Sequence, residues 1–256
     1  MKIAVCIKQV VTRDWPLRVD DTDHWVRDVD AGFEMNEPDA YALEEALRLK
    51  EQSGGEVIAC SAGPTRVSQV LREALARGAD RAIHLESDSL AAADSLTLAQ
   101  ALAAALRPEE PDLILTGLQS DDQGFGQTGV VMAELLGISH STIIMEVKLD
   151  LNGKGEVRVK RELEGGWFQW VTMATPALLT IQSGINQLRY ATLKGIMAAK
   201  KKEIRKVAID SSVESTQAIS RIYVPEKEKK TRFIEGTPSQ AAEELVRVLR
   251  DEARVV

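Results

Sequence analysis

The sequence predicts an α/β protein with a mostly parallel sheet and helices on both of its faces. In the first half of the chain, short apolar runs typical of strands alternate with amphipathic stretches typical of helices. This alternation indicates parallel strands joined by right-handed helical crossovers. After Ser141, apolar and polar residues alternate one by one, which indicates antiparallel strands instead. We therefore expect one large α/β domain that carries a β-hairpin insertion.

The elements of the first half follow from their patterns. A strand buried on both faces is a short, continuous apolar run, and a helix carries its apolar residues three or four positions apart. The helical stretch after the first strand is entered through Asn36-Glu37-Pro38-Asp39, where Asn36 and Asp39 could cap backbone amides. In chain order we expect strand 2–7, helix 39–52, strand 56–60, helix 65–78, strand 81–85, helix 90–106, strand 112–116 and helix 127–136.

The second half begins with the antiparallel insertion. Three alternating runs predict strands, and Glu164-Gly165-Gly166 between the last two indicates a hairpin turn. An apolar run at 177–181 predicts one more strand, and the segment 188–207 after it has a helical centre and a basic end, which suits a helix C-terminus. The three alternating runs lie at 143–151, 156–163 and 167–173.

The C-terminal part of the chain has a different composition. From about Asp210 it is polar, and a last helix is expected with Thr237 as its N-cap and Pro238 at its first position. We therefore expect an α/β domain over 1–209 and a C-terminal arm over 210–256. Composition leaves open whether this arm packs on its own domain or on another chain.

Length, charge and hydropathy exclude several kinds of protein. With 256 residues, 44% of them hydrophobic, the chain can bury a large core. A net charge of −7 argues against nucleic acid as the main partner, although the basic runs 200–202 and 227–230 could meet a local acidic surface. No apolar run approaches the roughly 18 residues of a membrane span, and no signal-peptide cleavage site follows the N-terminus. We expect a cytoplasmic protein without membrane insertion.

The titratable residues do not form a catalytic set. Cys6 and Cys60 lie in apolar runs without CxxC spacing, so we expect buried free thiols in a reducing compartment. The three histidines are scattered, so no metal site is expected. No Ser/His/Asp or Cys/His set is apparent, and the neighbours Asp121 and Asp122 suit loop caps or ribose contacts better than an acid/base pair.

The most informative segment is 111–137, which runs from a buried strand through a Gly-rich loop into an amphipathic helix. The first amides of a helix have no intrahelical acceptor and lie at the positive end of its dipole. The amides near Gly126, Gln127 and Thr128, with the Thr128 hydroxyl, could therefore bind a phosphate. Gly124-x-Gly126-x-x-Gly129 also matches the dinucleotide-binding fingerprint, but that fingerprint follows a first strand and this motif follows about the fourth. A helix start without a ligand is the plain alternative.

Other loops should lie beside this turn. Ligands of parallel sheets bind beyond the carboxyl ends of the strands, which places Cys6, residues 61–64 and residues 117–128 on a common edge. The small residues at 61–64 would let the backbone approach a flat ring such as adenine. Lys8 and Gln9 leave the first strand at the same edge and could reach a phosphate or a partner, or be ordinary surface residues. The sequence thus predicts a protein that holds a nucleotide.

Four ordered blocks are specific enough to identify a family. They are CIKQV, NEPDAYALEEALRLKE, VIACSAGPTRVSQVLREALARGADRAIHL and LRYATLKGIMAAKKKEI. Over nearly the full length, the chain resembles the beta subunit of electron transfer flavoprotein. The last block resembles the family signature near the partner-recognition segment, here about 181–203. GLQSDDQGFGQTG falls where the family has its phosphate loop.

This resemblance implies an adenine-nucleotide alpha-hydrolase-like fold and a heterodimer with an alpha subunit that holds the redox-active FAD. It implies an electron carrier rather than a classical enzyme, between acyl-CoA or other dehydrogenases and a quinone reductase or another acceptor. In family members, the subunit that corresponds to this chain binds AMP as a structural ligand. The arm 210–256 would pack on the alpha subunit. By position, Leu193 would dock into the dehydrogenase. Cofactor contacts would come from Cys6, Asn36, Glu37, Pro38, Asp39, Ala62, Gly117, Gln119, Ser120, Asp121, Asp122, Gly124, Gly126, Gln127 and Thr128.

The chain also departs from the family pattern. Leu118 replaces a Lys, Lys194 replaces a Pro, and residues 122–126 replace a more acidic run before Gln127. A branch of the family binds a second FAD in the beta subunit and bifurcates electrons from NADH, so AMP or FAD could fill the site. A stand-alone nucleotide-binding sensor of the stress-protein type shares the fold, but the hairpin insertion and polar tail argue against it.

Overall fold

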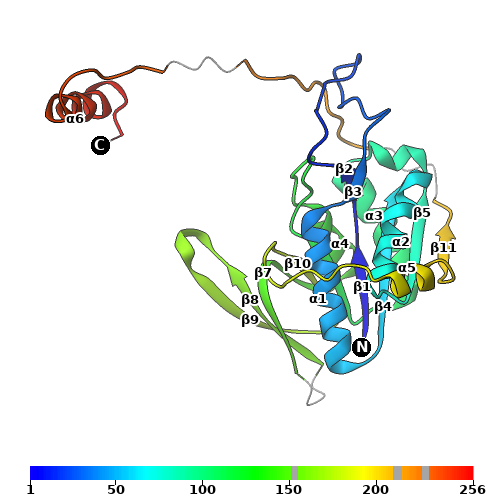
Figure 1. Ribbon diagram of the computed structural model, residues 1–256. Helices are drawn as coiled ribbons and strands as arrows, with labels where there is room; N and C mark the ends of the chain where they lie inside the picture. Colours follow the sequence, from blue (N-terminus) through cyan, green and yellow to red (C-terminus); the bar gives the residue numbers. More distant parts are fainter. Residues whose placement is uncertain (151–154, 210–214, 227–230, 256) are drawn as a thin grey trace. The chain divides into compact units, whose positions relative to one another are not determined.

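The computed structural model describes residues 1–150, 155–209, 215–226 and 231–255. The chain divides into two compact units, Met1–Arg221 and Ile222–Val256. Among the described residues, the first unit is built on a nine-stranded sheet with the order β11-β5-β4-β1-β6-β10-β7-β8-β9 (Figure 1). The strands from β11 to β7 in this order run parallel, and β8 and β9 are antiparallel to their neighbours. The predicted mostly parallel α/β fold is confirmed.

The central strands are almost fully buried, and because they are parallel, their carboxyl ends lie along the same side of the sheet. Their sequences are continuous apolar runs because helices cover both faces. The strands are β1 (Lys2–Cys6), β4 (Glu56–Gly63), β5 (Arg81–Glu86), β6 (Leu113–Gly117) and β10 (Ala177–Ile181), and the edge strand β11 is Ile204–Val207.

Helices pack on both faces of this sheet. One apolar core contains residues of α1 (Glu37–Ser53), α2 (Ser68–Arg77) and α5 (Leu193–Ala199) against one face. A second core contains residues of α3 (Ser95–Leu106) and α4 (Thr128–Leu136) against the other face. The two cores share the central strands, whose successive residues point to opposite faces.

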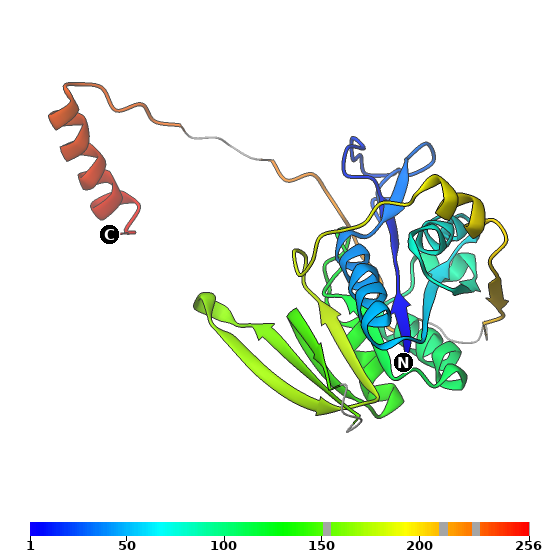
Figure 2. The same cartoon turned by 60° about the horizontal axis from the view of Figure 1, so that its bottom comes forward.

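The antiparallel insertion consists of β7 (Ser139–Leu149), β8 (Glu156–Glu162) and β9 (Phe168–Ala174). The start of β7 pairs with β10 and its end pairs with β8, so this strand joins the parallel and antiparallel parts of the sheet. The predicted turn is a 3-10 turn at Glu164–Gly166, in which both glycines have positive φ values. The hairpin extends away from the helices that cover the parallel strands (Figure 2).

Several predicted boundaries differ from the structure. Helix α3 begins at Ser95 rather than at residue 90, because the Asp94 side chain accepts the Thr97 amide and starts the helix there; a separate 3-10 turn forms at Asp88–Ala91. A further 3-10 turn, Thr65–Val67, precedes α2. The antiparallel pair β2 (Gln9–Val11) and β3 (Phe33–Met35) and the strand β11 were not predicted. Each of these strands is too short to carry a periodic pattern.

The second unit contains α6 (Pro238–Arg247), followed by a π-helical turn at Val248–Glu252. As predicted, Thr237 is the N-cap of α6 and Pro238 its first residue, and Gln240 completes a capping box with Thr237. The predicted features at Leu151, Asp210 and 227–230 lie outside the described residues. None of the helices in the described ranges combines the length and apolar character that crossing a bilayer requires.

Candidate nucleotide-binding site

The carboxyl ends of β1, β4 and β6 meet at one edge of the sheet, as predicted. Cys6 pairs with Cys60 on β4, and Val5 pairs with Leu115 on β6. The loops that leave these strands therefore start side by side. The half-buried Ala62 and the end of β6 at Gly117 border the same edge.

Asp39, near the start of α1, joins two of these strand ends. Its buried carboxylate accepts the amide of Gly117 at 2.7 Å and the amide of Lys8 at 2.7 Å. Burial raises the pKa of Asp39 to about 6, although these two amides favour its ionised form. Gly117 has no room for a side chain, because a Cβ atom would lie 2.5 Å from Asp39 Oδ1 and 2.6 Å from Pro38 Cβ. Asp39 therefore caps an amide just after β1 and an amide at the end of β6, rather than those of its own helix.

Asn36 fixes the first part of the Gly-rich loop. It precedes α1, yet its side chain makes no capping bond to that helix. Instead its amide group donates to the Gln119 carbonyl at 3.0 Å and its oxygen accepts the Asp121 amide at 2.9 Å. The backbone amide that Asn36 caps is therefore one of the loop rather than one of α1.

The two neighbouring acids of the loop each contact a cation from the segment after β1. Lys8 Nζ lies 2.7 Å from Asp122 Oδ1 and 3.0 Å from Gln123 Oε1, with Ser120 Oγ at 3.4 Å. Arg13 contacts Asp121 at 3.2 Å. Asp121 and Asp122 thus contact different cations.

A second contact of Arg13 extends this network to the helix entry. Arg13 also pairs with Glu37, and the Glu37 amide donates to Asp121 at 3.2 Å. Sequence reasoning did not single out Arg13, because a single cation in a polar loop carries no pattern that distinguishes it from a surface residue.

The helix α4 begins with unsatisfied amides at the end of this loop. Gln127 is its N-cap and makes no side-chain capping bond, and α4 begins at Thr128. In the described part of the chain, no hydrogen-bond acceptor is found for the amides of Thr128, Gly129 and Val130. Gly124 and Gly126 have φ values of 66° and 63°, which favour glycine. A phosphate would be stabilised here by free amides and by the helix dipole.

Gly129 brings this helix start close to the sheet. A Cβ atom at Gly129 would lie 2.8 Å from Thr116 Oγ1 and 3.0 Å from Thr180 Cγ2. The third glycine of the Gly124-x-Gly126-x-x-Gly129 motif therefore serves close packing between helix and strand. The same role is known for the third glycine of dinucleotide-binding turns, although the position after β6 differs from theirs.

Cys6 ends β1 and pairs in register with Cys60 of β4. Both are buried and free, on neighbouring strands. A hydrogen bond with Cys60, and then burial, raises the pKa of the Cys6 thiol well above its ordinary value. The Cys6 thiol is therefore uncharged, and Cys6 acts as a small apolar side chain at the end of β1. No group of His, Cys, Asp and Glu side chains that could hold a metal ion is found within the described ranges.

Leu193 lies away from this edge, at the first position of α5, where Thr192 is the N-cap. Its side chain is 83% exposed, and Tyr190, Ile196 and Met197 are exposed around it. Gly195 lets α5 approach α2, because a Cβ atom there would lie 2.3 Å from the Ala76 carbonyl oxygen.

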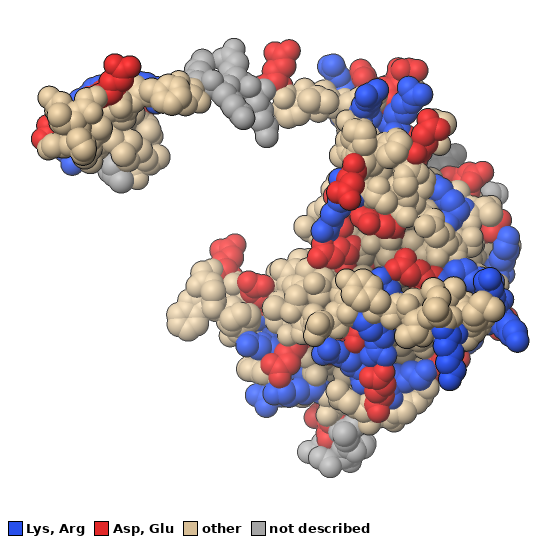
Figure 3. Space-filling model, in the orientation of Figure 1, with Lys and Arg blue, Asp and Glu red and all other residues tan. Residues whose placement is uncertain are grey.

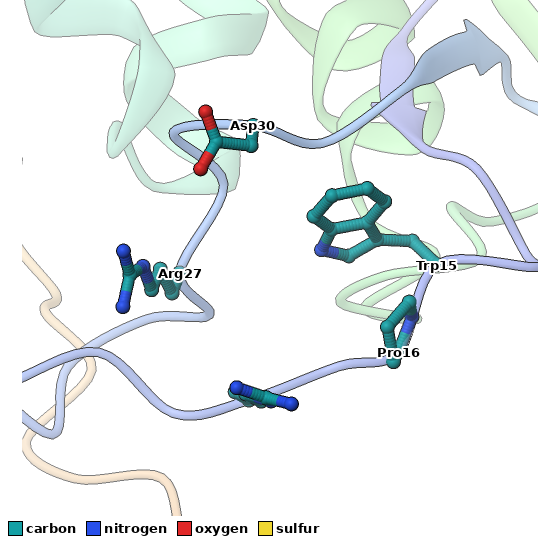
Figure 4. A pocket seen from close by; sticks show the side chains of 5 residues that line it. Trp15, Pro16, Arg27 and Asp30 are labelled. Carbon is teal, nitrogen blue, oxygen red and sulfur yellow. The ribbon is translucent and has the colours of Figure 1, made fainter.

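The long loop between β2 and β3 contains a cavity of about 290 Å³. Figure 4 shows Trp15, Pro16, Arg27 and Asp30 around it, and Arg18 completes its lining. None of these residues is among the predicted cofactor contacts.

On the face drawn in Figure 3, basic and acidic side chains are interspersed over the first unit, without an extended basic surface.

Comparisons with known proteins point to one family. A family model described as "Electron transfer flavoprotein domain" matches residues 24–212. The chain is 36% identical over 267 residues to "Electron transfer flavoprotein subunit beta" of Methylophilus methylotrophus, covering 98% of each chain. It is 38% identical over 258 residues to "Electron transfer flavoprotein subunit beta, mitochondrial" of Arabidopsis thaliana, and 35% identical over 260 residues to "Electron transfer flavoprotein subunit beta" of Mus musculus. These alignments cover 100% of this chain and 100% and 99% of the two relatives.

Proposed function

The chain belongs to the electron transfer flavoprotein family, and from this premise we propose that it is the beta subunit of a heterodimer whose alpha subunit holds FAD. The bound flavin supplies the redox chemistry, and this chain supplies a rigid nucleotide-bound domain and a docking surface. Electrons pass from acyl-CoA or other dehydrogenases to a quinone reductase or another acceptor. The two buried free thiols suit a reducing compartment such as the cytoplasm.

The observation that carries the nucleotide proposal is the start of α4. Among the residues that the structure describes, the first three amides of α4 have no acceptor, and they follow a loop that Asn36 and Asp39 hold in place. The residues fit an adenine nucleotide, with Gly126, Gln127 and Thr128 at the phosphate and the strand ends at Cys6 and Ala62 near the base. The remaining predicted contacts are Glu37, Pro38, Gly117, Gln119, Ser120, Asp121, Asp122 and Gly124.

We propose AMP as the resident nucleotide, with a structural role. It would satisfy the free amides of α4 and fix the loop 117–128 against the first strand. A second FAD is the alternative, since FAD also carries a phosphate beside its adenosine. A beta subunit with its own FAD would oxidise NADH and bifurcate the electrons.

Leu193 is proposed as the docking residue for the dehydrogenase. Its exposure, with that of Tyr190 and Met197, makes an apolar projection that a partner could bury. The C-terminal arm 210–256 is proposed to pack on the alpha subunit, which would cover the exposed apolar residues of this unit, such as Phe233 and Leu245.

The test is reduction of the purified heterodimer under anaerobic conditions. We expect an acyl-CoA dehydrogenase with its substrate, or another dehydrogenase, to bleach the flavin absorbance, and NADH alone to leave it unchanged. Bleaching by NADH would replace the carrier by the bifurcating enzyme. A chain that forms no flavin-containing complex with any alpha subunit would overturn the proposal.

A further inference from the structure

The chain between β10 and α5 is irregular, yet it is fixed to the face of the first unit that α1 covers. Ile185 and Leu188 pack against the apolar core that contains α1. The Asn186 side chain donates to the Tyr41 carbonyl at 3.2 Å and to the Glu45 carboxylate at 3.0 Å. Because these contacts are closely spaced along the chain, the segment has little freedom left to lose when a partner binds it.

Arg189 makes the last of these contacts, directly before the exposed part of the segment. Its Nε and Nη2 atoms bind the two carboxylate oxygens of Glu44 at 2.8 and 3.0 Å, and its backbone amide donates to Glu44 at 3.2 Å. Its Nη1 atom lies 2.6 Å from Glu51, two turns further along α1. Glu44 is only 4% exposed. A buried carboxylate needs a charged partner, and the planar guanidinium satisfies both of its oxygens at once.

The residues that follow Arg189 are exposed. Tyr190 is 87% exposed, and Leu193 begins α5 three residues later. Beyond the exposed stretch, Arg72 of α2 donates to the Ala199 carbonyl at 2.6 Å. Each end of the stretch is thus fixed by a guanidinium, one end to α1 and the other to α2.

We propose that Arg189 is a positioning residue for dehydrogenase docking, and that its ion pair with Glu44 holds Tyr190 and Leu193 in the arrangement that the dehydrogenase binds. A side chain that is already held in its bound position loses less entropy when a partner buries it. Arg189 therefore affects the affinity of docking and leaves electron transfer within the docked complex unchanged. This inference rests on the proposed function, because it takes Leu193 as the docking residue.

Steady-state reduction separates affinity from electron transfer. The dehydrogenase that reduces the wild-type heterodimer is kept at a fixed concentration, the heterodimer concentration is varied, and a dye reoxidises the flavin. Arg189→Lys keeps the positive charge but loses the planar fork that binds Glu44 and Glu51 together. We expect the KM for the heterodimer to rise about fivefold to tenfold, and kcat to stay within about twofold of the wild-type value.

Arg48→Lys is the matched control. Arg48 lies on α1 and binds the same Glu44 carboxylate at 3.1 Å, so this variant changes an ion pair of Glu44 without altering the docking segment. We expect its KM to equal the wild-type value. Equal KM values in the two variants would overturn the proposal. A loss of kcat or of flavin content in Arg189→Lys would also overturn it, because Arg189 would then support the whole heterodimer rather than docking.

Amide hydrogen exchange of α5 in the heterodimer is a second test, and it needs no dehydrogenase. We expect the amides of residues 195–199 to exchange about threefold faster or more in Arg189→Lys than in Arg48→Lys, because the start of α5 is held less firmly. Equal exchange would refute the positioning role. If no dehydrogenase reduces a flavin-containing wild-type heterodimer, the proposed function fails, and the exchange rates alone decide whether Arg189 positions α5.

Discussion

At the scale of single residues, Asp39 is the side chain on which the geometry of the site depends most. It is buried at the start of α1 and binds the amides of Lys8 and Gly117, which follow β1 and end β6. A carboxylate is suited to this place because it accepts hydrogen bonds at both oxygens. Burial of its charge nevertheless costs stability, which is why its pKa rises.

Because burying the Asp39 charge costs stability, the free energy of unfolding should depend on pH. The pKa of Asp39 rises from 3.8 to about 6 in the folded chain, so between these values the folded state binds more protons than the unfolded state. Stability from this group is therefore present at low pH and is lost as the pH rises through about 6, by up to about 3 kcal/mol. Urea unfolding between pH 4 and 7 should show this slope in the wild-type chain, and Asp39→Asn should lack it. Identical slopes would show that Asp39 titrates normally.

A second residue-scale prediction concerns Lys8. Its pairing with Asp122 offsets a negative charge that lies in the loop before the amides proposed to bind the phosphate. Lys8→Met leaves this charge unpaired, and we expect the nucleotide to bind about tenfold more weakly in the heterodimer, as measured by calorimetry after nucleotide removal.

The double variant Lys8→Met with Asp122→Asn provides the control. Because it removes both charges, we expect it to recover most of the lost affinity. A double variant as weak as Lys8→Met alone would mean that Lys8 acts through packing or through direct contact with the ligand, rather than by neutralising Asp122.

At the scale of elements, the short helix α5 packs against α2 and is fixed in place by contacts with α1 and α2. Arg189 binds Glu44 and Glu51 of α1 before the helix begins, and Gly195 allows α5 to contact α2. The exposed Leu193 is thus presented by a fixed support rather than by a free loop.

This arrangement predicts opposite behaviour for two substitutions in α5. Leu193→Ala removes an exposed side chain, so thermal stability should stay within about 0.5 kcal/mol while electron transfer from the dehydrogenase slows. Gly195→Ala should destabilise the chain by about 1–3 kcal/mol, because its Cβ atom would overlap the Ala76 carbonyl. Thermal unfolding and a coupled dehydrogenase assay distinguish the two. A large loss of stability in Leu193→Ala would refute a docking role.

Helix α3 gives a prediction for the segment at the end of the first unit. Asp94 caps α3 through Thr97 and also accepts the amides of Thr216 and Gln217. Burial alone would raise the pKa of Asp94, but the hydrogen bonds from Thr97 and Thr216 outweigh it and hold the pKa well below its ordinary value. Its contribution to stability is therefore present at neutral pH and is lost in acid, below the ordinary value of 3.8.

We expect Asp94→Ala to cost about 1–2 kcal/mol at pH 7 and to speed amide exchange at residues 215–217. Near pH 2 the difference from the wild-type chain should shrink. If the variant exchanged its amides at 215–217 as slowly as the wild-type chain does, the anchoring role of Asp94 would be wrong.

The elements also show what the sequence could and could not predict. The buried parallel strands and most helices were predictable because their apolar patterns are long and regular. The start of α3 was not, because Asp94 overrides an apolar pattern that begins earlier. The pair β2 and β3 joins segments separated by a long loop, and no local pattern encodes such pairing. For the same reason, the role of Asn36 in holding Gln119 and Asp121 required the folded chain.

At the scale of the whole molecule, the first unit combines three surfaces on one sheet. The carboxyl ends of the central strands form the candidate nucleotide site, α5 presents Leu193, and, among the described residues, β9 pairs with β8 alone at the edge of the sheet. A chain with such an edge strand and exposed aromatic residues is suited to be one subunit of a stable complex.

The central claim is that this chain holds one AMP within a heterodimer that carries one FAD. The most direct measurement is to co-express it with an alpha subunit, purify the complex, release the ligands by heat and count FAD and AMP by chromatography. We expect one FAD and one AMP per heterodimer. Two FAD and no AMP would replace the carrier by the bifurcating enzyme, and a homodimer that carries ATP and no flavin would contradict the account.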